Sequence, residues 1–257
     1  MKNTFLFGAA LLLACGSASA GVISDNVATG YWGGDAHGFG DIIGDAMFDV
    51  KSADVRRTGS LLTIQIVTNF AGHAGVDTWA TPEGIGYGDV FLASSWNVGG
   101  SDAHHIADNA TTGTVWSYGL NLGNRWSNSG GTFQLYELKG ATNASNILNS
   151  ESFMTCALGT QCYYRNGEET AVKTTSSSVH NTGLSGTWIV NPNNSLSFSI
   201  DVKGTALAGY DTMALHWGET CQNDVIEGFT TVPEPAGVAL FALGLAGLAL
   251  RRRKLVK

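Results

Sequence analysis

The chain has 257 residues, of which only 14% are charged, and it contains 34 glycines. Its net charge is −7, but residues 21–232 alone carry 8 basic and 20 acidic side chains, a net charge of −12. Because a nucleic-acid surface must neutralise phosphates with Lys and Arg, this composition excludes nucleic acid as a partner. An acidic span suits calcium, a basic partner or simple solubility.

The first twenty residues have the three parts of a secretory signal peptide. Lys2 supplies the basic start, residues 5–14 form the apolar stretch, and residues 18–20 form a small-residue cleavage site before Gly21. A second interpretation is that residues 12–15 resemble a lipoprotein box, which would leave Cys15 as the lipidated N-terminus. Both interpretations predict that the chain is exported.

Residues 21–231 are predicted to form one extracellular domain made of strands. In residues 195–203 apolar side chains alternate with serines, and residues 61–70 place Thr63 and Gln65 opposite the isoleucines. The other predicted strands are 45–50, 89–96, 113–122, 132–140, 186–191 and 211–218. Gly-Gly pairs and an Asn-Pro-Asn-Asn run mark turns between them. This pattern predicts an all-β, antiparallel β-sandwich of jelly-roll-like type, with residues 141–185 as a long irregular excursion.

The mature chain would keep three cysteines. In an oxidising compartment, Cys156 and Cys162 are placed to close a short disulfide loop. Cys221 is then either unpaired or replaces one of the other two as a partner. Without CxxC spacing or paired histidines, a zinc site is not expected.

A glycine-rich stretch near the start of the domain has several aspartates. Asp35, Asp41 and Asp45 recur every four to six residues, and loops of Gly and Asp supply the oxygen ligands that calcium takes. Asp224, near the end of the domain, would complete such a site if the fold brings it close. The spacing is not that of an EF-hand, so calcium is a prediction here without a recognised motif.

The seven tryptophans are mostly expected in the core. Trp32 and Trp126 lie among Gly, Asn and Ser in turn-like surroundings, where an exposed ring is able to stack on a sugar. These two residues are therefore predicted to contact glycan.

Sequence motifs for catalysis are missing. The chain has no G-x-S-x-G elbow, no H-E-x-x-H pair and no P-loop, so we expect that it is not an enzyme. The alternative is an enzyme acting on polysaccharide, which would need two carboxylates about 5–10 Å apart.

The C-terminal end has an uncharged run, residues 236–250, followed by Arg251, Arg252, Arg253 and Lys254. A helix of this run would span about 22 Å, against about 30 Å of hydrocarbon in a bilayer. It is therefore a marginal transmembrane helix, and the basic tail is expected to stay in the cytoplasm. The domain then lies outside the inner membrane.

Residues 232–257 resemble the PEP-CTERM sorting signal of Gram-negative bacteria. The resemblance rests on Val232, Pro233, Glu234 and Pro235, the short apolar helix and the basic tail, in that order. Proline blocks entry into a helix and keeps the motif extended for a processing enzyme. Residues 213–228 and 41–50 are also similar to stretches of exosortase-dependent surface proteins.

The resemblance implies an exosortase as partner, a transient stay in the inner membrane, and a final place on the cell surface or in the extracellular matrix. Proteins with this signal are associated with exopolysaccharide and biofilm. The expected function is therefore structural or adhesive in such a matrix. The alternatives are a calcium-assisted carbohydrate-binding module and, third, an enzyme that acts on polysaccharide.

Overall fold

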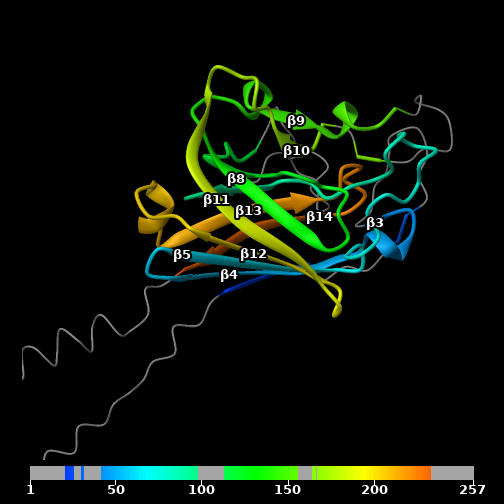
Figure 1. The fold of residues 1–257 in the computed structure, drawn as a ribbon, viewed down its shortest axis with the longest axis horizontal. Coiled ribbons are helices and arrows are strands. Elements are labelled where there is room, and N and C mark those ends of the chain that lie inside the picture. Colours follow the sequence, from blue (N-terminus) through cyan, green and yellow to red (C-terminus); the bar gives the residue numbers. More distant parts are fainter. Residues whose placement is uncertain are drawn as a thin grey trace, which may run out of the picture. The chain divides into compact units, whose positions relative to one another are not determined.

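Ten strands of the domain join in one antiparallel sheet (Figure 1). The computed structural model describes residues 21–25, 30–31, 42–97, 113–155, 164–165 and 167–232. They belong to one compact unit, Ala20–Pro233. In spatial order the strands are β1 (Val22–Ser24), β4 (Val50–Thr58), β5 (Leu61–Thr68), β12 (Ser195–Asp201), β11 (Val179–Asn191), β8 (Gly130–Leu138), β7 (Tyr118–Leu122), β6 (Val90–Ala93), β13 (Thr212–Gly218) and β14 (Val225–Thr231).

The remaining elements are short. β2 (Gly30–Tyr31) pairs in parallel with β3 (Ile42–Ile43), and β9 (Ile147–Asn149) pairs antiparallel with β10 (Glu169–Val172). The helical segments among the described residues are single 3-10 turns: η1 (Ala46–Phe48), η2 (Asn143–Ser145), η3 (Ser150–Ser152) and η4 (Ala206–Gly209). None of the helices described is long and apolar enough to cross a membrane. The helix predicted at 236–250 lies outside the described residues.

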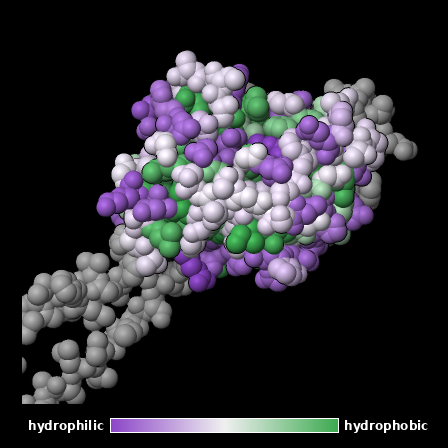
Figure 2. Space-filling view, viewed as in Figure 1, coloured by the Kyte–Doolittle hydropathy of each residue, from purple (hydrophilic) through white to green (hydrophobic). Residues whose placement is uncertain are grey.

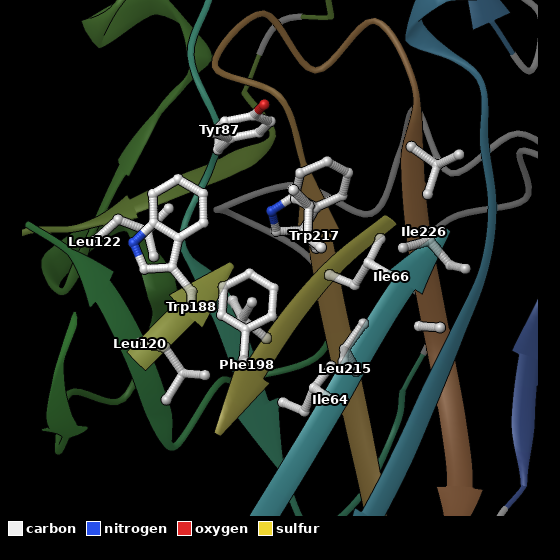
Figure 3. Close-up of a cluster of buried hydrophobic side chains, with 14 of the residues drawn as sticks. Ile64, Ile66, Tyr87, Leu120, Leu122, Trp188, Phe198, Leu215, Trp217 and Ile226 are labelled. Atoms are coloured by element: carbon white, nitrogen blue, oxygen red, sulfur yellow. The ribbon is translucent and has the colours of Figure 1, made fainter. Parts of the chain in front are cut away.

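The sheet curls until its two edge strands, β1 and β14, contact each other. The side chains that point inside the curl form the main core, and its labelled members converge from strands far apart in the sequence (Figure 3). Trp188 of β11 stacks on Phe198 of β12 at 6.3 Å between ring centroids, and Tyr87 meets Trp188 edge-on at 5.3 Å. Such aromatic contacts, with the burial of aliphatic side chains around them, hold the two halves of the sheet together.

The outer face of the sheet is covered on one half and open on the other. Over β6, β7 and β13 the excursion that carries β9 and β10 builds a second core, which includes Phe91, Trp116 and Val172. Gly119 on β7 allows the close approach of β10, since a Cβ built there would lie 2.3 Å from Cγ2 of Val172. No comparable layer of described residues covers β4, β5, β12 and the adjoining part of β11, where buried and accessible positions alternate.

A buried carboxylate attaches the covering layer to the sheet. Asp89 is fully buried and accepts hydrogen bonds from the backbone amides of Leu122 at 3.0 Å and Val172 at 2.8 Å. It also forms an ion pair with Arg125 at 3.0 Å, whose guanidinium lies 5.2 Å from the ring centroid of Phe153. Because these partners satisfy both oxygens, the charge is tolerated in the interior.

The all-β antiparallel class predicted from the sequence is confirmed, with the difference that ten of the strands form one continuous sheet in place of the two packed sheets of a sandwich. The prediction of a strand at 45–50 was wrong for residues 45–49, because β4 begins only at Val50. The carboxylate of Asp45 accepts a hydrogen bond from the amide of Met47 at 2.9 Å and starts η1 instead. Likewise, residues 113–117 are not in a strand, and β7 begins only at Tyr118.

Candidate functional site

A polar groove lies on the open outer face of the sheet, across β4, β5, β12 and β11. It has a volume of about 350 Å³. Its lining residues are Asp54, Arg56, Thr63, Ile64, Gln65, Thr187, Ile189, Ser197, Phe198 and Ser199. Figure 2 shows, from the side on which β11 and β8 face the viewer, a surface that is mostly white and purple with separate green areas.

The register of the strands places the outward side chains of the groove in two rows. One row consists of Asp54, Gln65, Ser197 and Ile189, and the other of Arg56, Thr63, Ser199 and Thr187. Neighbouring strands are about 4.8 Å apart, and equivalent side chains along one strand are roughly 7 Å apart. The rows therefore form a regular grid in which every position except the exposed Ile189 carries a hydrogen-bonding group. The groove is hollow because the short side chains of Thr63, Ser197 and Ser199 lie between the longer Arg56 and Ile189.

The two charges of the groove neutralise each other. Nε of Arg56 donates to Oδ2 of Asp54 at 2.9 Å, and Nη2 of Arg56 forms a second, shorter contact with the same oxygen. The hydrogen bond and the charge of Asp54 raise the pKa of Arg56. A ligand in the groove therefore meets a neutral surface that still offers charged donors and acceptors at one edge.

Hydrogen bonds next to the groove hold some of its polar groups in place. Nδ2 of Asn191 donates to the hydroxyl oxygens of Ser197 at 2.8 Å and Ser195 at 3.1 Å. Nε2 of Gln65 lies 3.4 Å from the hydroxyl of Ser195. Since the hydroxyl of Ser197 accepts one hydrogen bond, its own proton is directed elsewhere and is available to a ligand.

The residues predicted for calcium are only partly described. Asp35 and Asp41 lie outside the described residues. Asp45 is exposed and caps η1, whereas Asp224 is buried and accepts hydrogen bonds from the amides of Val50 at 2.6 Å and Val225 at 2.8 Å. The two segments do approach each other, because the amide of Ile43 donates to the carbonyl of Asn223 at 2.7 Å.

Within the described ranges no group of three or more His, Cys, Asp or Glu side chains is arranged to hold a metal ion. Burial raises the pKa of Asp224, and the charge of Arg165 opposes this shift. Asp224 thus fastens the start of β14 to the start of β4. The calcium site itself stays a prediction that depends on Asp35 and Asp41.

Of the two tryptophans predicted to stack on glycan, the structure describes one. Trp32 lies outside the described residues. Trp126 is half-buried, and its Nε1 donates to the carbonyl of Gly84 at 2.9 Å, which fixes the ring against the neighbouring loop. Trp79, on that same loop, is 62% exposed, with its Nε1 bound to Asp77 at 3.0 Å. Trp79 is the more accessible ring, although its neighbours in the sequence do not distinguish it from the other tryptophans.

Of the cysteines, Cys221 is buried and forms no disulfide with a described residue. Cys156 and Cys162, the predicted pair, lie outside the described residues. Burial raises the pKa of the Cys221 thiol, so this side chain is an inert part of the core. His216 is fully buried, and its Nδ1 lies 2.9 Å from Oε2 of Glu227.

Sequence alone did not identify the groove. The alternation in residues 61–70 and 195–203 correctly predicts that Thr63, Gln65, Ser197 and Ser199 face away from the core. The missing information was the pairing of β5 with β12, which lie more than 120 residues apart in the sequence. Only the fold brings these outward side chains side by side.

The last strand leads directly into the C-terminal segment. Val232 is buried, and its amide donates to the carbonyl of Asp211 at 2.8 Å, so it belongs to the domain. Pro233, Glu234, Pro235 and the basic tail from Arg251 to Lys254 lie outside the described residues. The described part of the chain is therefore a β-rich domain with a polar outer groove, whose fold ends where the C-terminal segment begins.

Residues 231–254 match the family model of the PEP-CTERM protein-sorting motif. The chain is an exported protein of the cell envelope or surface, with a signal that brings it to the membrane for processing by an exosortase. No curated protein and no solved structure matches the chain.

Proposed function

We propose that this exported protein has a structural and adhesive role in an extracellular polysaccharide matrix. Its adhesion would come from binding neutral polysaccharide in the polar groove. The sorting signal supports the location at the cell surface. The observation that carries the binding part is the two-row grid of hydroxyl, amide and paired charged groups on the open face of the sheet.

The chemistry of the groove suits sugar hydroxyls, which both donate and accept hydrogen bonds. Thr63, Ser197 and Ser199 offer hydroxyls of the same kind, and Gln65 adds an amide. The four strands give the groove a length of roughly 14 Å, which favours a chain of sugars over a single one.

Charge favours a neutral polysaccharide over an acidic one. Arg56 is the one cation among the lining residues, and Asp54 neutralises it. The whole span 21–232 has a net charge of −12, which repels uronic-acid or sulfated chains at low ionic strength.

We further propose that the role is binding and not catalysis. Glycoside hydrolysis requires two carboxyl groups on opposite sides of the scissile bond. Among the residues that line the groove, Asp54 is the one carboxylate, and it is engaged by Arg56.

The proposal is tested by titration calorimetry of the protein as released from cells. Neutral glucan and galactan oligosaccharides are compared with alginate oligosaccharides of equal length. We expect binding to a neutral oligosaccharide, and a double variant, Gln65→Ala with Ser197→Ala, should bind it at least about 10-fold more weakly, since two hydrogen bonds of about 1 kcal/mol each are removed.

The matched control is Ser185→Ala, an exposed serine of β11 outside the groove. It should bind like the unmodified protein. Tighter binding to alginate than to any neutral oligosaccharide, or equal affinity of the double variant, would show that the groove does not have this role.

A further inference from the structure

A second surface feature lies where the edges of the sheet meet. Val22 of β1 and Phe229 of β14 are large apolar side chains that are 55% and 56% exposed. The partly exposed ring of Trp96 lies 5.9 Å from the ring of Phe229. We name Val22, Trp96 and Phe229 the seam patch.

The two edge strands place Val22 and Phe229 at corresponding positions. A Cβ on Gly228 would lie 2.8 Å from Cγ2 of Ile23, and a Cβ on Gly21 would collide with Thr230. Residues 23 and 21 thus face residues 228 and 230, and Val22 faces Phe229 between them. Both side chains point to the outer surface, because Ile23 between its neighbours is buried.

A buried chain of hydrogen bonds fixes the third member of the patch. Nε1 of Trp96 donates to Oε1 of Glu227 at 2.7 Å, and Oε2 of Glu227 lies 2.9 Å from Nδ1 of His216. Nε2 of His216 in turn lies 2.7 Å from the carbonyl oxygen of Glu169. The ring of Trp96 is therefore held in one orientation before any partner arrives, which lowers the entropy cost of binding.

The patch lies close to the point where the chain leaves the domain. Phe229 precedes Val232 by three residues of extended chain, which is about 10 Å. Val232 is anchored by burial and by its hydrogen bond to Asp211. From Val232 to the first residue of the apolar run, Ala236, there are four residues, which reach at most about 14 Å.

This short connection limits how far the domain is able to move from a membrane. The polar headgroup layer on one side of a bilayer is roughly 5–8 Å thick. While residues 236–250 are in the hydrocarbon, the end of the domain that carries Val232 is held within about 10 Å of the headgroups. The partly exposed Trp96 and the exposed Phe229 at that end are aromatic side chains of the kind that partition into this layer.

We propose that the seam patch docks on the lipid headgroup region while the precursor is still attached to the membrane by its C-terminal signal. The contact would fix the orientation of the domain beside the membrane and keep the Pro-Glu-Pro segment at the lipid surface. Because residues 21–232 carry a net charge of −12, the contact is with zwitterionic lipid and is weakened by anionic lipid. The proposal rests on the sorting signal and not on glycan binding in the groove.

The test uses the full chain in vesicles of phosphatidylcholine, with lipids brominated near the glycerol end of the acyl chains as quenchers of tryptophan fluorescence. We expect quenching that disappears in Trp96→Phe and persists in Trp79→Phe, the control at an exposed ring elsewhere. A double variant, Val22→Thr with Phe229→Thr, should lose roughly half or more of the quenching, because interfacial binding scales with apolar area.

The double variant changes only exposed positions, so its fold is checked by circular dichroism and is expected to be unchanged. Replacing half of the lipid by phosphatidylglycerol at low salt should reduce the quenching. Quenching that is unchanged in the double variant, or that depends on Trp79, would overturn the proposal. Failure of the full chain to float with the vesicles would overturn it together with its premise, whereas a loss of glycan binding would leave it unaffected.

Discussion

Glu219, in the turn between β13 and β14, shows how one side chain makes the domain sensitive to pH. It is fully buried, and no described donor lies in hydrogen-bonding geometry to either carboxylate oxygen. Burial raises the pKa of Glu219 to about 8, and the charge of Asp49 adds to the shift. Arg165 and the nearby amides of Glu219 and Asp224 oppose it without overcoming the loss of solvation. At neutral pH this carboxyl is therefore mostly protonated.

The raised pKa predicts that the free energy of unfolding falls as the pH rises. Below about pH 4.5 the carboxyl is protonated in both states, so it contributes no pH dependence. Between about 4.5 and 8 the unfolded chain releases the proton while the folded chain keeps it, which favours unfolding. The variant Glu219→Gln should thus be more stable than the unmodified protein at pH 7, by up to about 3 kcal/mol, with no such gain at pH 4.

Urea unfolding of both proteins at several pH values measures this difference. Glu83→Gln is the matched control, since Glu83 is exposed, and it should show no gain that grows with pH. A stability difference between Glu219→Gln and the unmodified protein that is constant from pH 4 to pH 8 would contradict the prediction.

At the scale of residues, the sequence predicted which side chains face outward but not which ones have unusual surroundings. Alternation identifies Thr63 and Ser197 as outward-facing because a strand has a fixed period of two. In contrast, nothing in the sequence around Glu219 indicates that it is buried, because its burial comes from the packing of segments far apart in the chain. The same holds for Trp79, whose exposure depends on the path of its loop.

At the scale of elements, the contact of β1 with β14 depends on the absence of a side chain at Gly228. A Cβ there would lie 2.8 Å from Cγ2 of Ile23, closer than real Cβ contacts allow. Gly228→Val should push β1 away from β14 and destabilise the domain by about 1–3 kcal/mol. Hydrogen exchange of the amides of residues 22–24 should become faster, while that of the centrally placed β12 should change little.

Thr231→Val, at an exposed position of the same strand, controls for the change in side-chain type. It should leave both the unfolding free energy and the exchange of β1 unchanged. If Gly228→Val gives unchanged exchange at β1, the two edge strands do not depend on each other in the way described.

The elements that the sequence revealed are those with one buried and one accessible face. β5 and β12 alternate clearly and were predicted nearly to the residue. β4 was missed because one of its inward positions is Arg57, whose Nη1 donates to the carbonyls of Leu207 and Tyr210 at 2.8 Å. β14 was missed because it is buried on both faces over most of its length, which removes the alternation.

At the scale of the whole molecule, the end of the fold restricts where the C-terminal signal is cut. Val232 is a buried part of the core, and Thr231 pairs with Thr212 in the sheet. Cleavage directly before Val232 would remove this buried side chain, and cleavage further upstream would also remove part of β14 and open the edge of the sheet. We therefore predict that the protein recovered from the cell surface ends at or after Val232 and begins at Gly21.

Mass spectrometry of the intact surface form, with peptide mapping of both ends, measures this outcome. A strain without an active exosortase serves as the control, and its protein should keep the sequence up to Lys257. A mature C-terminus within residues 225–231 would contradict the prediction.

The meeting of β1 and β14 also gives the domain two unlike poles. Both ends of the domain, Gly21 and Val232, emerge at one pole, next to the turn that joins β4 to β5. The antiparallel order puts the loop after Thr68, which carries the exposed Trp79, at the other pole. Processing at either end therefore acts at this one pole, and the opposite pole, which carries Trp79, keeps the same exposed side chains before and after release.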